Sequence, residues 1–145
     1  MADAEMRSAK RPISVLRHPI YSLLVPIPIV CFIGALLTDY AYMNSGGNLL
    51  WVNFSSWLLA AGLLFGALAG LALLIDAFRG AAGWFQFVLL LAAWVVEFIN
   101  SLVHARDGWT AVVPLGLTLS VVAAILILLS GWPWGSARYR AGEVA

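Results

Sequence analysis

Long apolar runs that carry almost no charge divide the chain into four segments. Asp, Glu, Lys and Arg are absent from 18–38, 40–75 and 108–137, and the run 80–105 contains one charge, Glu97. A helix needs about 20 apolar residues to cross the hydrocarbon core of a bilayer, and each run supplies them. The pattern therefore predicts an all-α integral membrane four-helix bundle. The predicted spans lie near 19–42, 51–76, 81–104 and 110–132.

The segments outside these spans are too short to fold as separate domains. The first apolar run is longer than the core of a cleaved signal peptide, so we interpret it as a retained helix. The predicted parts are a cytoplasmic N-terminal segment at 1–17, a four-span membrane domain at 18–134 and a cytoplasmic tail at 135–145.

Basic residues predict the orientation of the bundle. If the N-terminus is cytoplasmic, only Arg106 of the eight Lys and Arg residues faces the other side. Basic residues are retained on the cytoplasmic side of membrane proteins. We therefore expect both termini in the cytoplasm. The seven basic residues placed there are Arg7, Lys10, Arg11, Arg17, Arg79, Arg138 and Arg140.

Composition supports a membrane protein and limits the chemistry. The chain of 145 residues is 63% hydrophobic and 10% charged, with a mean hydropathy of +0.95. A soluble domain carries about 25% charged residues. The formal net charge of +1 and the lack of a basic cluster argue against nucleic-acid binding. Cys31 is the one cysteine, which excludes an intrachain disulfide and a cysteine-based metal motif.

Span two carries three glycines at successive spacings of four, Gly62, Gly66 and Gly70. Residues at this spacing share one helix face, and small residues let another helix backbone approach closely within a membrane. Two uses of the face stay open, which are packing within the bundle and a contact between subunits.

Span one contains Pro26 and Pro28 within its apolar run. Because proline removes a backbone donor, we expect the two prolines to bend this helix.

A polar stripe on span three is the most informative feature of the sequence. Glu97, Asn100, Ser101 and His104 stand at i, i+3, i+4 and i+7, and Asp39 ends span one on the same side of the membrane. Ionisable groups within a membrane are costly, so they face the bundle interior or a water-filled cavity.

Three interpretations of the stripe stay open. In a proton or ion path, Glu97 and Asp39 are the carriers. In a metal site, His104, Asp39 and Asp107 supply the ligands. In a structural network, Glu97 is neutral or pairs with Arg106 and holds the bundle together.

Sequence motifs for catalysis are missing, so we do not expect an enzyme. Nucleophile triads, glycine-rich phosphate loops and HExxH are absent, and no CxxCH haem attachment motif is present. His18 and His104 lie at opposite ends of the predicted bundle, so they are not the axial ligands of one haem. The cofactor question stays open, with metal binding undetermined.

Three stretches resemble a bacterial family of predicted membrane proteins catalogued as domain of unknown function 2231. The stretches are His18-Pro19 through Pro26 and Pro28 to Asp39, then Trp57 to Asp76, and Leu129-Ser130-Gly131-Trp132 to Gly142. The resemblance implies a four-span protein of the bacterial inner membrane. It also implies a redox neighbourhood, because members occur fused to Rieske-type iron–sulfur domains. This chain has Tyr21-Ser22 and Ala141 where members often have His-Pro and His, which weakens a cytoplasmic haem or metal site.

Three functions fit these observations. The first is a small non-enzymatic multi-pass membrane protein that forms an oligomer or serves as an accessory subunit, with lipid, itself or other membrane subunits as partners. The second is a redox-linked module associated with haem or quinone. The third is a small proton or ion transporter or channel that uses Glu97 and Asp39.

Overall fold

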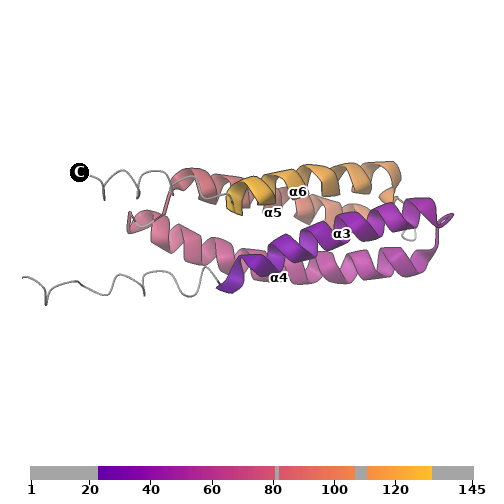
Figure 1. The fold of residues 1–145 in the computed structure, drawn as a ribbon, viewed down its shortest axis with the longest axis horizontal. Coiled ribbons are helices and arrows are strands. Elements are labelled where there is room, and N and C mark those ends of the chain that lie inside the picture. The colour runs from indigo at the N-terminus through magenta and orange to yellow at the C-terminus, as the bar shows by residue number, and fades with distance from the viewer. Residues whose placement is uncertain (1–22, 81, 107–110, 132–145) are drawn as a thin grey trace, which may run out of the picture.

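The computed structural model describes residues 23–80, 82–106 and 111–131. Over these residues the chain forms long helices joined by short turns, and no strand is present among them (Figure 1). The helices are α3 (Pro26–Asn44), α4 (Leu49–Phe78), α5 (Trp84–His104), a short π-helical segment η3 (Val112–Gly116) and α6 (Leu117–Gly131).

Four stretches in this part of the chain are long and apolar enough to cross a membrane: α3, α4, α5, and η3 together with α6. The predicted all-α bundle of four spanning helices is confirmed. Consecutive spans run antiparallel, so the α3–α4 turn, the C-terminus of α5 and the start of η3 lie at one end, here called the α3–α4 end (Figure 1). The α4–α5 turn lies at the opposite end. The cytoplasmic location of the termini stays a prediction.

The two prolines of α3 start the helix and do not interrupt it. Pro26 and Pro28 stand in the first turn, after helical residues Leu23 and Leu24 and a turn at Val25. The first N–H groups of a helix have no partner within it, so a proline there breaks no hydrogen bond. The expected bend inside the span is therefore not found: α3 begins at Pro26, and Val25 before it has helical φ and ψ angles of −61° and −38°.

The turns between the helices are built from residues that suit them. Gly46 and Gly47 have φ angles of 69° and 88°, in the left-handed region that a side chain disfavours. Asn48 caps α4, since its Oδ1 accepts from Leu50 N at 3.0 Å. Gly80, with a φ of 68°, ends α4 at the opposite turn.

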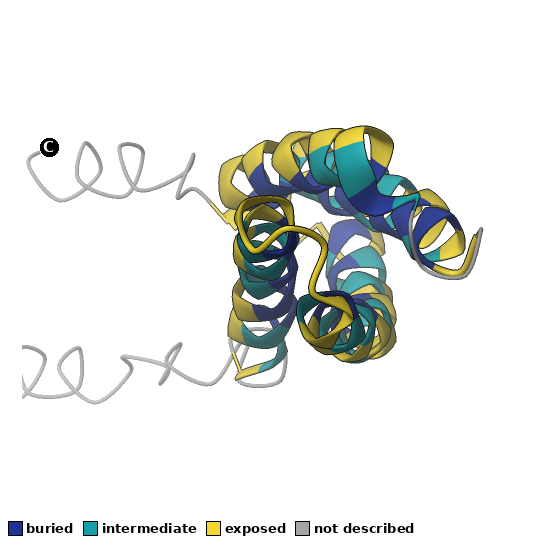
Figure 2. Cartoon of the chain, turned by 90° about the vertical axis from the view of Figure 1, so that its right-hand side faces the viewer, coloured by how far each residue is buried: buried dark blue, intermediate teal, exposed yellow. Residues whose placement is uncertain are grey.

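The outside of the bundle is apolar, as a lipid environment requires. Large side chains such as Leu23, Trp57 and Phe78 are more than two-thirds exposed (73%, 72% and 74%). Figure 2 shows the buried sides of the helices facing one another and the exposed sides facing outward. A soluble protein does not expose so many large apolar side chains, so the bundle is solvated by lipid.

The interior has an apolar part and a polar part. In the half nearer the α4–α5 turn, the core is apolar and includes Phe32, Leu73, Leu90, Ala93 and Ile127. In the half nearer the α3–α4 end, buried polar side chains take the place of the apolar core. A small apolar cluster then closes that end, formed by Tyr42, Val52 and Val112.

Candidate functional site: a buried polar network

Asp39 of α3 is the centre of a hydrogen-bonded network that reaches every spanning helix. Its Oδ1 accepts from Ser55 Oγ of α4 at 2.6 Å and lies 2.8 Å from His104 Nε2 of α5. Its Oδ2 accepts from Ser120 Oγ of α6 at 2.6 Å. One carboxyl group therefore connects α3 to all three of the other helices.

Asn100 of α5 extends the network from Ser120 to Glu97. Its Nδ2 donates to Ser120 Oγ and to Glu97 Oε2, both at 2.8 Å. The polar network, as defined here, consists of Asp39, Ser55, Glu97, Asn100, His104 and Ser120. Within it, an unbroken series of hydrogen bonds runs from Glu97 through Asn100 and Ser120 to Asp39 and His104.

Both ring nitrogens of His104 have hydrogen-bond partners. Nδ1 lies 2.9 Å from the backbone oxygen of Asn100, which only accepts, so Nδ1 carries a hydrogen. Nε2 lies 2.8 Å from Asp39 Oδ1 and 3.1 Å from Ser55 Oγ. One further hydrogen lies between His104 Nε2 and Asp39 Oδ1. Whether it is bonded to the nitrogen or to the oxygen, the net charge of the two side chains together is zero. In this arrangement the ring has no free nitrogen for a haem iron or another metal.

Burial makes the hydrogen bonds of the network necessary. Five of its six side chains are completely buried, and His104 is 2% exposed. A buried polar group that lacks its partner costs about 1–3 kcal/mol, and a buried charge without a partner costs more. The three donors around Asp39 therefore stabilise its carboxyl group, and they fix how the four helices pack.

The network includes some of the predicted stripe and leaves some of it out. Asp39, Glu97, Asn100 and His104 come together as members. Ser101 does not join them, because its Oγ donates to Phe98 O of the same helix at 2.7 Å.

Ser55 and Ser120 are network members that were not predicted from the sequence. Each is a serine within a predominantly apolar span, and the sequence does not set either apart, since Ser56 follows Ser55 and Thr118 lies two residues before Ser120.

A close approach at Gly116 brings the fourth span onto the network. Val113 has non-helical φ and ψ angles, so the chain kinks there before α6 begins. A Cβ at Gly116 would lie 3.2 Å from His104 Cε1 and 3.3 Å from Asn100 Oδ1. A side chain at this position would push the kinked segment away from the network.

The other interpretations of the stripe find less support in the geometry. Arg106 is exposed at the end of α5, and Glu97 bonds to Asn100 instead of to this arginine. Asp107, the third proposed metal ligand, lies outside the described residues. Among the residues that are described, no group of three or more His, Cys, Asp or Glu side chains could hold a metal ion. His18 and Pro19 of the family motif also lie outside them.

The glycines of α4 pack against the bundle's own helices. A Cβ at Gly62 would lie 2.4 Å from Phe32 Cε1, and a Cβ at Gly66 would lie 3.1 Å from Trp94 Cδ1. Trp94 also donates its Nε1 hydrogen to Leu63 O at 2.9 Å, which ties α5 to α4. Gly70 is different, since a Cβ there would have one neighbour, at 4.0 Å.

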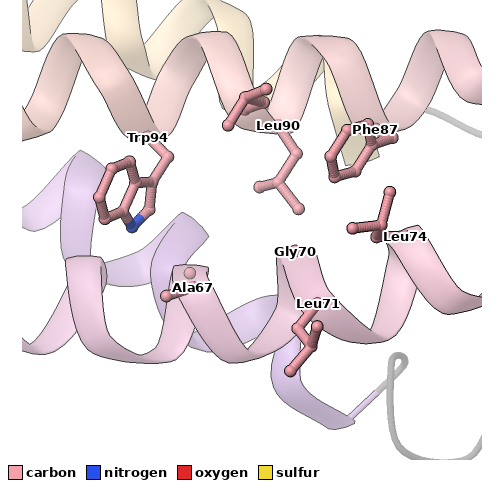
Figure 3. A pocket seen from close by; sticks show the side chains of 9 residues that line it. Ala67, Gly70, Leu71, Leu74, Phe87, Leu90 and Trp94 are labelled. Atoms are coloured by element: carbon pink, nitrogen blue, oxygen red, sulfur yellow. The ribbon is translucent and has the colours of Figure 1, made fainter.

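An apolar groove lies between α4 and α5 beside Gly70 (Figure 3). Its volume is about 290 Å³, and it lies in the half of the bundle away from the polar network. The residues that line it are Gly66, Ala67, Gly70, Leu71, Leu74, Phe87, Leu90, Leu91 and Trp94.

Comparison with known proteins identifies the family of the chain. The class that the fold defines is a four-span membrane protein, and residues 17–142 match the family described as Predicted membrane protein (DUF2231). The chain belongs to this family. No curated protein and no solved structure matches the chain.

Proposed function

We propose that the chain is a non-enzymatic protein of the bacterial inner membrane that binds and exchanges protons at the polar network. The observation that carries the proposal is the unbroken series of hydrogen bonds from Glu97 to the Asp39–His104 pair. Carboxyl, imidazole and hydroxyl groups in hydrogen-bond contact are the groups that pass protons within membrane proteins. The chain would then act as a small proton transporter or channel.

The position of the network indicates the direction of proton entry. One apolar layer of Tyr42, Val52 and Val112 separates the network from the α3–α4 end. On the other side lies the deeper apolar core around Phe32 and Leu90. Protons would therefore enter past the thin layer, and Glu97 is the carboxyl group of the polar network that lies closest to the apolar half.

A liposome assay tests this proposal. The protein is reconstituted with a pH-sensitive dye inside the vesicles, and a membrane potential drives protons inward. We expect flux above that of protein-free vesicles, and a return to that level in Glu97→Gln, because the amide does not release a proton. The matched control is Ser101→Ala, which removes a hydroxyl of the same helix outside the network. Wild-type flux equal to that of empty vesicles, or flux unchanged in Glu97→Gln, contradicts the proposal.

A second candidate function is that of a subunit in an oligomer or a larger membrane assembly. The observation that favours it is the groove between α4 and α5, where Gly70 leaves room that the bundle's own side chains do not fill. Helices associate in lipid where small residues permit close contact. The mass of the intact protein, measured after gentle extraction, tests this function.

A further inference from the structure

Two oxygen atoms in the polar network have no hydrogen-bond partner among the residues that the structure describes, although both are buried. They are Glu97 Oε1 and Asn100 Oδ1, and both side chains are completely buried. The other polar atom of each of these side chains is hydrogen-bonded, since Asn100 Nδ2 donates to Glu97 Oε2 at 2.8 Å. Buried oxygen atoms without a donor are rare, so this pair needs an explanation.

Counting hydrogens gives that explanation. The two hydrogens of Asn100 Nδ2 are used by Glu97 Oε2 and Ser120 Oγ, so Oδ1 is left as an acceptor. An ionised Glu97 also has acceptors alone. One proton on Glu97 Oε1 would serve both unpartnered atoms, because the resulting O–H can donate to Asn100 Oδ1.

We propose that Glu97 is a protonated carboxylic acid in the resting protein and forms a two-bond ring with the Asn100 carboxamide. In the ring, Asn100 Nδ2 donates to Glu97 Oε2, and Glu97 Oε1 donates to Asn100 Oδ1. The inference deepens the proposed function, because it places the exchangeable proton on Glu97.

The charges around Glu97 favour the acid over a carboxylate bridged by a water molecule. The described ionisable side chains that act on it are Asp39 from α3 and His104 from its own helix, and these two form a neutral pair. α4 and α6 contribute the neutral hydroxyls of Ser55 and Ser120 to the network. A carboxylate at position 97 would thus be a buried charge without a counter-charge, which is costly in a membrane.

Infrared spectroscopy of the reconstituted wild-type protein tests the inference. We expect the carbonyl-stretch band of a protonated carboxylic acid at neutral pH, with a downward shift in D₂O. Glu97→Gln should lower the intensity of this band by the contribution of Glu97. Asn100→Leu should keep it and shift it to higher wavenumber, because the acid loses its acceptor. Asp76, on α4 outside the network, provides the control variant Asp76→Asn, in which the band should be unchanged.

Two results would overturn the inference. One is a wild-type spectrum without an acid carbonyl band, which indicates an ionised Glu97 with a water molecule between the two oxygen atoms. The other is an acid carbonyl band whose intensity is the same in Glu97→Gln as in the wild type. The first result is measured on the unmodified protein, so it does not depend on the folding of any variant. A band that depends on Glu97, in a protein without proton flux, would support this inference and contradict the transport proposal, so the two failures are distinguishable.

Discussion

Ser120 links the two parts of the polar network, so its hydroxyl should matter for stability. It donates to Asp39 Oδ2 at 2.6 Å and accepts from Asn100 Nδ2 at 2.8 Å. Ser120→Ala leaves a buried carboxyl oxygen without a donor, and we expect the free energy of unfolding to fall by about 1–3 kcal/mol. Reversible denaturation in detergent micelles measures this change.

The same helix offers a matched control for Ser120→Ala. Ser130 is also buried, at 2% exposure, but its Oγ donates to Ile127 O of its own helix. Ser130→Ala removes a hydrogen bond within one helical turn and leaves no carboxyl group without a donor. The free energy of unfolding should therefore change by less than about 0.5 kcal/mol. If Ser120→Ala and Ser130→Ala lower the free energy of unfolding equally, the network does not stabilise the bundle.

The sequence predicts part of this site, and the reason lies in helix geometry. Glu97, Asn100 and His104 share a face because their spacing follows the helical period. Ser101 fits the same period about as well, and only the positions of the neighbouring helices decide that it points away. Ser55 and Ser120 belong to other helices, and the sequence does not reveal which residues of different helices meet.

At the level of the helices, Gly62 sets the distance between α4 and α3. A Cβ at this position would lie 2.4 Å from Phe32 Cε1 and 3.0 Å from Cys31 Cβ, and Phe32 is completely buried. We expect Gly62→Ala to lower the free energy of unfolding by about 1–3 kcal/mol, through overpacking. Thermal unfolding in micelles measures the effect.

Gly70→Ala is the control for Gly62→Ala, since it adds the same methyl group to the same helix. The nearest neighbour of its Cβ would be Leu90 Cδ2 at 4.0 Å, an ordinary contact. The stability of this variant should differ from that of the wild type by less than about 0.5 kcal/mol. If the stability of Gly62→Ala also equals that of the wild type, α3 can move away from α4 without loss of stability, and Gly62 does not set the distance between the two helices.

Helix number and type were predictable from the sequence, whereas the start of α3 was not. Apolar runs long enough to span a membrane leave one regular structure, because a helix satisfies every backbone polar group internally. Pro26 and Pro28 fit an interior bend as well as a first turn when read from the sequence alone. The structure places them in the first turn of α3, where Pro28 packs toward α4: a Cβ at Gly66 would lie 3.6 Å from Pro28 Cβ.

At the scale of the whole molecule, the two halves of the bundle suit different tasks. The half nearer the α3–α4 end holds the polar network, and the other half combines an apolar core with the open groove. If both termini are cytoplasmic, the network lies toward the periplasm and the groove toward the cytoplasm. Proton exchange and assembly would then use separate regions, and a substitution in one should leave the other intact.

Filling the groove should therefore change assembly without changing proton flux. Gly70→Leu places a large side chain between α4 and α5, where a partner helix would approach. By native mass spectrometry, we expect the wild type at a mass above 15.6 kDa, as a multiple or with an added subunit. Gly70→Leu should lose that added mass. Leu64→Phe, which enlarges a side chain that is 61% exposed and does not line the groove, should keep it. A wild type that is monomeric in several mild detergents would contradict the subunit function and leave the polar network as the basis for the protein's activity.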